Sequence, residues 1–225
     1  MKKFKQISHN PEPEVIGVNN GVYQLEIEIA NDIDGIADKL YTSLNNEAVE
    51  KIITSDIKFI GKLVKNAKIT DFMVFSPYIF GINYMISQKV VDIFNEVGVS
   101  NDEYLLKEIK IIGIDTKYYL LYIPMISSEE IDFSNSILYE DGIIKAKKYL
   151  KVNSYIEYRN ALEKNPFIDF EKICLNKKYE KRHIISVRGA VKPFFSTQLI
   201  NVLNRHNITG FVVLNHGIEL VFDCE

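Results

Sequence analysis

The chain has 225 residues, a net charge of −3 and a pI near 5.9. A hydrophobic fraction of 47% is enough for a sizeable core, and a charged fraction of 25% is ordinary for a globular protein. The acidic balance argues against a nucleic-acid-binding protein, which normally carries a strongly basic domain. No stretch approaches the about 18 apolar residues of a membrane span, so we expect a soluble protein without a membrane partner.

The first elements are predicted from the spacing of apolar residues. Residues 1–21 are polar and contain two prolines, so we expect an extended lead-in there. Alternating apolar and polar residues predict a half-buried strand over 23–29. Apolar residues at helical spacing over 46–66 predict a helix. Weak helix formers lie at the centre of this stretch, so the helix is able to end there and be followed by a second element. Residues 69–75 fit either a strand or a loop.

The stretch from Ile86 to Val99, ISQKVVDIFNEVGV, carries signals for both ends of one helix. Ser87 is expected to cap its start, because a serine hydroxyl accepts a hydrogen bond from an N–H of the first turn. Apolar residues at steps of three and four form one buried stripe. Gly98 supplies a left-handed stop, after which Val99 is able to contact Phe94 in a Schellman ending.

A second stretch, FSTQLINVLNRHNI, runs from Phe195 to Ile208 and fills the same positions 109 residues later, since 195 − 86 = 109. Ser196 is the expected cap, and Asn207 takes the place of glycine as the left-handed residue. The likeness indicates two pseudo-repeated helix–strand units. Capping rules alone also generate such likeness, so two unrelated, well-capped helices are the alternative.

Strands are predicted in the rest of the chain where β-rich runs lie between turn signals. Residues 104–114 and 118–123 form the clearest hairpin, which Pro124 ends. Residues 127–142 are polar and turn-rich, and 143–165 fit a short strand followed by a short helix. Short strands are also expected in the last third, at 184–187, 211–214 and 218–222.

These elements predict an α+β fold with a mostly antiparallel sheet and capped helices. No low-complexity linker and no shift in composition marks a boundary, so we expect a single domain over 1–225. The pattern does not specify an oligomeric state.

Charge is unevenly distributed along the chain. No Lys or Arg lies between Lys117 and Lys145, whereas residues 145–182 carry eleven Lys or Arg against five acids. The simpler interpretation of this uneven charge is that both segments are loops exposed to solvent. Alternatively, the acidic segment contacts a basic partner, because charge complementarity speeds association and fixes orientation. The candidate partner-binding residues are Glu129, Glu130, Asp132, Glu140 and Asp141.

No catalytic, cofactor-binding or metal site is predicted. The chain has no GxSxG, GxGxxG or GxxxxGK[ST] motif. Cys174, Cys224 and the four histidines lack the paired spacing of a zinc site, and so few cysteines favour a reduced, cytoplasmic setting. The basic run NKKYEKRH, 176–183, is able to contact phosphates, which is the nucleic-acid alternative.

Several short segments, taken together in order and spacing, resemble one bacterial family. They are Thr70-Asp71-Phe72, ISQKVVDIFNEVGV, a hairpin with Tyr118-Tyr119, IDFSNS at 131–136, and FFSTQLINVLNRHNITGFVV. This pattern resembles the Imm11-type immunity proteins, with the Imm43-type group as a neighbouring possibility. The resemblance covers roughly residues 67–213. The chain departs from it at Asn207, where a glycine is common, and in its unmatched N-terminal third.

The resemblance implies a cytoplasmic bacterial immunity protein of a polymorphic toxin system. Such a protein binds its cognate toxin and neutralises it by forming a non-covalent complex, so it is not expected to be an enzyme and implies no catalytic residues. Two alternatives stay open. One is an enzyme acting on a small ligand or a nucleic acid, which needs a concave pocket with convergent polar groups. The other is a self-associating scaffold module.

Overall fold

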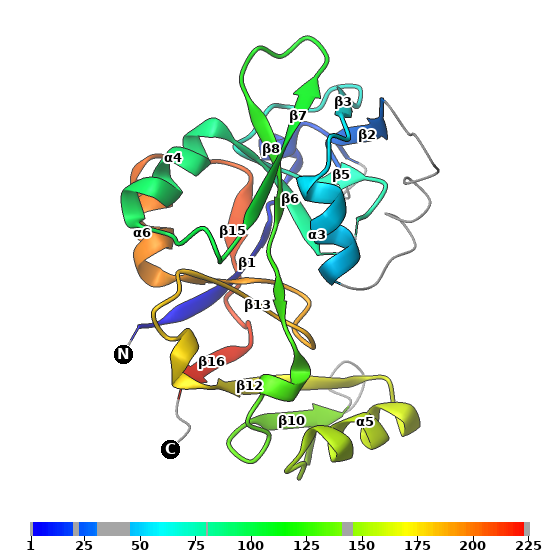
Figure 1. Cartoon of the computed structure of the whole chain (residues 1–225), viewed down its shortest axis with the longest axis vertical. Coiled ribbons are helices and arrows are strands. Elements are labelled where there is room, and N and C mark those ends of the chain that lie inside the picture. Colours follow the sequence, from blue (N-terminus) through cyan, green and yellow to red (C-terminus); the bar gives the residue numbers. More distant parts are fainter. Residues whose placement is uncertain (1, 20–22, 31–45, 80, 141–145, 223–225) are drawn as a thin grey trace. The chain divides into compact units, whose positions relative to one another are not determined.

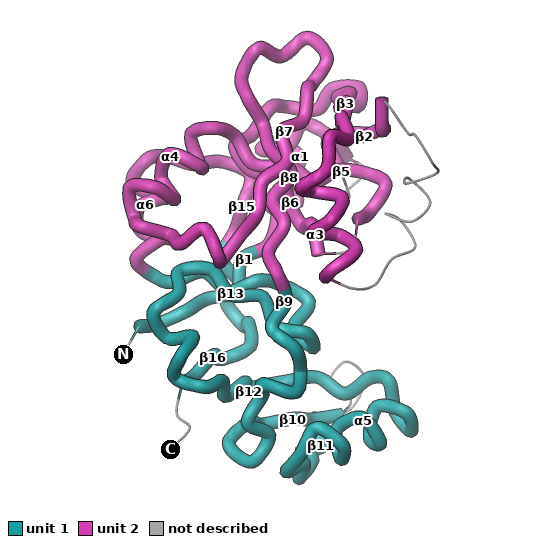
Figure 2. Tube along the Cα trace, viewed as in Figure 1, with its two compact units in different colours: residues 1–7, 125–197, 213–225 teal, residues 8–124, 198–212 magenta. Residues whose placement is uncertain are grey.

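A computed structural model describes residues 2–19, 23–30, 46–79, 81–140 and 146–222 (Figure 1). Within these residues the chain has the predicted α+β fold. Contacts divide the chain into two compact units (Figure 2). Unit 1 contains residues 1–7, 125–197 and 213–225, and unit 2 contains residues 8–124 and 198–212. The assignment of all 225 residues to one domain stays a prediction.

Unit 2 is organised around a mixed sheet whose described strands follow the order β4-β6-β8-β7-β3-β2-β5. The strands are β2 (Leu25–Ile29), β3 (Phe59–Leu63), β4 (Phe72–Met73), β5 (Phe75–Ser76), β6 (Ile82–Ser87), β7 (Leu105–Ile111) and β8 (Tyr118–Tyr122). The other described elements are α1 (Pro13–Ile16), α3 (Asn46–Thr54), α4 (Gln88–Val97), α6 (Thr197–Arg205, whose first residue belongs to unit 1) and β15 (Phe211–Val213, whose last residue belongs to unit 1). The predicted hairpin is confirmed, because β7 and β8 pair in antiparallel register.

The core of unit 2 forms where α3 packs its apolar stripe against the sheet. Val49, Ile52 and Ile53 of α3 are buried in the same cluster as Leu25 of β2 and Leu120 of β8. The helix ends where the sequence carries weak helix formers, and β3 is the second element that follows it. The predicted helix and its interruption are therefore both confirmed.

Unit 1 contains two groups of paired strands among its described residues. One follows the order β1-β14-β13-β9 and the other β11-β10-β12-β16. The strands are β1 (Phe4–His9, whose last two residues belong to unit 2), β9 (Met125–Ile126), β10 (Ile137–Glu140), β11 (Lys148–Leu150), β12 (Ile168–Leu175), β13 (Ile184–Val187), β14 (Phe194–Ser196) and β16 (Glu219–Phe222). The helical elements are η1 (Ser128–Glu130), α5 (Tyr155–Lys164) and η2 (Lys177–Tyr179). The rings of Phe133, Tyr158 and Phe170 stack in its core at centroid distances of 5.1 to 6.3 Å.

One sequence prediction is corrected by these strands. The expected lead-in over 1–21 instead contributes β1, which pairs with β14 and buries Ile7 completely. The buried polar side chain of Gln6 interrupts the apolar alternation that would have indicated a strand. The strands predicted at 211–214 and 218–222 are confirmed as β15 and β16, and β16 pairs in parallel with β12.

The start of α4 corrects the predicted cap. Ser87 holds the N-cap position, yet its side chain makes no capping hydrogen bond. The Ser87 hydroxyl donates to the Asp71 carboxylate at 2.9 Å. Backbone carbonyls of neighbouring segments accept from the helix start instead, Asp71 O from Ser87 N at 2.9 Å and Lys117 O from Gln88 N at 3.0 Å. Tertiary contacts thus satisfy the N–H groups of the N-cap residue and of the first helical residue, while the serine hydroxyl is used to donate to Asp71.

The start of α6 repeats this arrangement within unit 1. Ser196 N donates to His183 O and Thr197 N donates to Lys3 O, each at 2.8 Å. The Ser196 hydroxyl lies 2.9 Å from His183 Nδ1. The flanking strands are also equivalent, since β6 lies between β4 and β8, and β14 lies between β13 and β1, all in antiparallel pairs. The likeness therefore extends beyond the helices, which favours the pseudo-repeat over two unrelated helices.

The predicted ends of both helices are confirmed. Gly98 and Asn207 adopt positive φ values of 79° and 52°. Val99 N and Ile208 N each donate to the carbonyl five positions earlier, at 2.9 and 3.0 Å, as a Schellman ending requires.

Candidate interaction surface

Segments that carry the family resemblance meet inside unit 2. The Asp71 carboxylate accepts hydrogen bonds from the Ser87 hydroxyl at 2.9 Å and from the Thr209 backbone N–H at 2.9 Å. The backbone of Phe72 donates to Thr209 O at 2.9 Å, and the rings of Phe72 and Phe211 lie 5.3 Å apart. These residues therefore connect separate parts of unit 2, and this role in the fold accounts for their presence in the motifs.

Thr70 completes this connection. Its hydroxyl donates to Phe72 O at 2.6 Å and accepts from the Gln24 amide at 3.0 Å. The Tyr118 hydroxyl donates to Thr70 O at 3.1 Å. A Cβ atom on Gly210 would lie 2.0 Å from Phe72 O, so only glycine fits beside this strand. The motif residues are thus packed together, and their contacts within the fold account for them without a partner.

The predicted acidic residues lie at separate places in unit 1. Glu129 and Glu130 belong to η1, Asp132 follows it, Glu140 ends β10, and Asp141 lies outside the described residues. Glu130 forms an ion pair with Lys178 at 2.6 Å and accepts a hydrogen bond from the Tyr179 hydroxyl at 3.3 Å. The Lys178 ammonium lowers the pKa of the Glu130 carboxyl.

Further carboxylates of this segment also have partners within the chain. Glu140 pairs with Lys148 and accepts from the Asn165 amide at 3.0 Å. Asp132 accepts from the backbone N–H and the side-chain amide of Asn135, at 3.2 and 2.8 Å. The acidic and basic segments of the sequence therefore neutralise each other in part, which weakens the attraction that a basic partner would feel. That the acidic residues contact a partner stays a prediction.

A different face of unit 1 exposes aromatic and charged side chains beside one another. Tyr139 of β10 lies opposite Tyr149 of β11 and Asp169 of β12. Their neighbours Leu138 and Phe170 are buried, and because side chains alternate along strands, the tyrosines and Asp169 lie on the opposite, solvent-facing side. The side chain of Tyr149 is 59% exposed.

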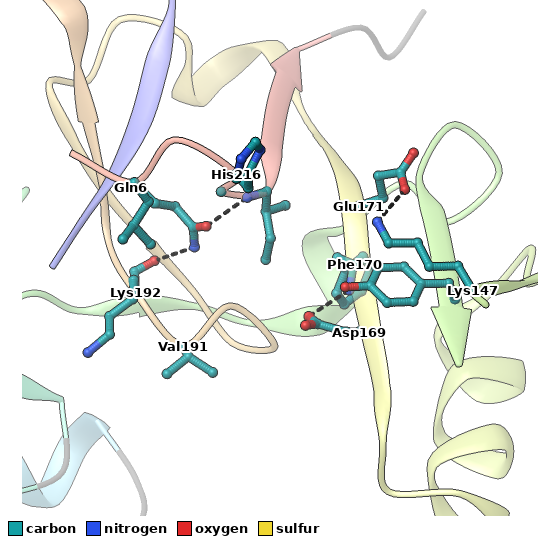
Figure 3. A pocket seen from close by; sticks show the side chains of 12 residues that line it. Gln6, Lys147, Asp169, Phe170, Glu171, Val191, Lys192 and His216 are labelled. Atoms are coloured by element: carbon teal, nitrogen blue, oxygen red, sulfur yellow. Dashed lines mark hydrogen bonds and ion pairs between the residues drawn. The ribbon is translucent and has the colours of Figure 1, made fainter. Parts of the chain in front are cut away.

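Hydrogen bonds hold this face in a fixed arrangement (Figure 3). The Glu171 carboxylate accepts from Lys147 Nζ at 2.7 Å and from the Tyr149 hydroxyl at 3.0 Å. Lys147 Nζ lies 4.2 Å from the centre of the Tyr139 ring, a cation–π distance. The hydrogen bond from Lys147 lowers the pKa of Glu171. Partial burial raises the pKa of Tyr139, and the Asp169 carboxylate raises it further.

This face forms one wall of an open hollow of about 310 Å³ (Figure 3). Val191, Lys192 and His216 contribute to the opposite wall, and Val191 is 83% exposed. Gln6 joins the segments of that wall, because its amide donates to Lys192 O at 3.0 Å and accepts from Ile218 N at 2.7 Å. Burial lowers the pKa of Lys192. Tyr149 does not line the hollow but lies beside it, bonded to Glu171. We call the exposed and half-buried residues of this face, together with Val191, the hollow surface: Tyr139, Lys147, Tyr149, Asp169, Glu171 and Val191.

The hollow surface combines two tyrosines and a valine with three charged side chains. Exposed tyrosine and valine provide apolar contact area, and the surrounding charges form a polar rim. No continuous stretch of the sequence indicates this surface, because its side chains come from four separate segments. The only local signal is the alternation in IDFEKICL, 168–175, which forms β12.

In the described part of the chain, no group of three or more His, Cys, Asp or Glu side chains is placed to hold a metal ion. In the same residues, no helix combines the length and apolar character needed to cross a membrane. In comparisons with known proteins, no protein-family model matches this chain, and no curated protein matches it.

Proposed function

We propose that this protein is a cytoplasmic immunity protein that binds a cognate toxin and neutralises it by forming a non-covalent complex. The observation that carries the proposal is the hollow surface, where exposed tyrosine and valine lie beside charged groups that are already paired. The resemblance of residues 67–213 to immunity proteins supplies the expected kind of partner.

The order of the hollow surface supports tight binding. A tyrosine provides a large contact area for few rotatable bonds, and binding costs less free energy when its side chain is already fixed. The Tyr149 hydroxyl is fixed by Glu171, and Glu171 is in turn held by Lys147. A partner would therefore meet a surface that needs little further ordering.

The charged groups of this surface support binding without chemistry. Lys147 and Glu171 are bound to each other, and the Tyr139 hydroxyl is engaged with Asp169. A nucleophilic catalyst instead directs a nucleophile and a base toward one reacting atom. The arrangement is better suited to complementing a partner's surface than to activating a substrate.

Co-expression tests the proposal. The toxin domain encoded beside this chain's gene is expressed in a susceptible bacterium with and without the protein. We expect growth to be restored and the two proteins to purify as one complex. If stoichiometric protein leaves toxicity unchanged and the proteins elute separately, the proposal is wrong.

A further inference from the structure

A second concave feature of unit 1 lies between β1 and β16. It is a groove of about 400 Å³, lined by residues 2–6 on one side and by residues from Leu214 to Val221 on the other. Its apolar base includes Phe4 and Leu220, both 7% exposed. The rings of Phe4 and Phe222 meet at a centroid distance of 5.4 Å, so the two strands are joined by side chains at this base.

One wall of the groove is the edge of a sheet. β16 pairs with β12 through residues 219–222 and stands last in the order β11-β10-β12-β16. Among the described strands of that sheet, none lies on the other side of β16. Such an edge presents backbone N–H and C=O groups to an added strand. The groove is closed at one end, where Gln6 O accepts from Leu214 N at 2.9 Å.

The opposite wall is basic. Lys2, Lys3 and Lys5 line the groove, whereas Glu219 is the acidic residue among those that line it. Lys2 Nζ donates to Lys181 O at 2.8 Å, which brings the basic run 177–182 beside these lysines. The charge of this region is thus opposite to the net charge of −3 of the whole chain. A negatively charged segment would be attracted and oriented here.

We propose that this groove receives an extended, acidic segment of a partner protein, which adds to β16 as a further strand. The edge supplies backbone hydrogen bonds, alternate side chains of the segment contact the base at Phe4 and Leu220, and the remaining acidic side chains face Lys3 and Lys5. An edge strand and an apolar base together fit a peptide better than a nucleic acid. The inference goes beyond the proposed function, because it does not require the partner to be a toxin.

A peptide titration tests this inference on the full-length protein. The probe is the capped hexapeptide Ac-Glu-Val-Glu-Val-Glu-Val-NH₂, and binding is measured by calorimetry and by amide hydrogen exchange. We expect saturable binding that weakens as salt increases, together with slower exchange of amides within 219–222. The same peptide methylated on alternate backbone nitrogens should bind about tenfold more weakly, because it cannot complete the strand pairing.

Protein variants test whether the positive charge of the groove contributes to peptide binding. Lys3→Glu with Lys5→Glu should weaken binding by about tenfold or more, whereas the matched pair Lys62→Glu with Lys110→Glu, on exposed positions of β3 and β7, should leave it unchanged. Binding of the lysine counterpart Ac-Lys-Val-Lys-Val-Lys-Val-NH₂ with equal affinity would overturn the inference. It would also be overturned by full affinity of the methylated peptide, by no saturable binding of the acidic peptide, or by complete displacement of the peptide by an equally charged single-stranded oligonucleotide.

Discussion

The carboxylate of Asp71 accepts hydrogen bonds from the backbone N–H and the hydroxyl of Thr209, at 2.9 and 3.1 Å, although the two residues lie 138 positions apart. The same carboxylate accepts from the Ser87 hydroxyl at 2.9 Å. A single side chain therefore connects the start of α4 with the segment that follows α6. Hydrogen bonds to an ionised group are stronger than neutral ones, so this contact is an important part of the stability of unit 2.

Asp71→Asn is expected to lower the free energy of unfolding by about 2 kcal/mol. An amide keeps one acceptor oxygen, loses the charge and presents an NH₂ group to donors, so it cannot accept all three hydrogen bonds. Urea unfolding followed by circular dichroism measures the change. Asp92→Asn is the matched control, because Asp92 accepts only from Gln88 on the exposed side of α4 and should change stability by less than about 0.5 kcal/mol. Equal effects of the two substitutions would contradict this role of Asp71.

Gly210→Ala is expected to destabilise unit 2 far more than Gly113→Ala. Both glycines have positive φ, 90° and 78°, so both substitutions introduce backbone strain. A Cβ atom at Gly210 would lie 2.0 Å from Phe72 O, whereas one at Gly113 meets no atom within 4 Å. The difference between the two variants in the free energy of unfolding should therefore measure the steric clash, and we expect it to be about 2 kcal/mol or more. Thermal or urea unfolding measures it. Equal stability of the two variants would show that Thr209–Phe211 does not pack against Phe72 in this way.

The stability of the protein should fall as pH decreases below the usual histidine pKa of 6.5, in part because of His183. Burial lowers the pKa of His183, and the nearby Lys2 ammonium lowers it further. The unfolded chain then binds more protons than the folded chain in the window below 6.5, so stability is full above that window and is lost as the pH falls through it.

Urea unfolding between about pH 5 and pH 7.5 measures this dependence. His183→Gln should remove part of the slope, because glutamine has no proton to take up in this range. His216→Gln, at an exposed position, serves as the control for the loss of one histidine. An unchanged slope in the His183 variant would show that another group produces the acid sensitivity.

Local signals predicted much of the fold. Gly98 and Asn207 mark the helix ends correctly, since a left-handed residue acts within its own turn. The alternation over 23–29 and the polar turn before Tyr118 led to strands that the structure contains. Features that depend on distant partners were missed. Ser87 has the sequence context of a cap, but its hydroxyl donates a hydrogen bond to the distant Asp71 carboxylate and makes no capping hydrogen bond.

The candidate surface was less predictable than the fold. The acidic segment is conspicuous in the sequence, yet Glu130 and Glu140 are paired with Lys178 and Lys148, which follow in the basic segment. The hollow surface, by contrast, has no continuous signature. Tyr139 and Val191 are unremarkable as single residues, and only the strand pairing of unit 1 and the Gln6 hydrogen bonds bring them into the walls of one hollow.

The affinity of two matched variants for the toxin domain of the co-expression experiment tests the central claim most directly. Tyr149→Ala with Val191→Asp removes exposed apolar contacts from the hollow surface of unit 1. Tyr78→Ala with Ile112→Asp makes the same kind of change at exposed positions of unit 2, which are 64% and 58% exposed. Calorimetric titration should show that the first pair raises the Kd by about a hundredfold, in line with the loss of central interface residues, whereas the second pair leaves it unchanged. A wild-type Kd for the Tyr149 and Val191 variant, or no measurable binding by the wild-type protein, would contradict the claim that this surface neutralises a toxin.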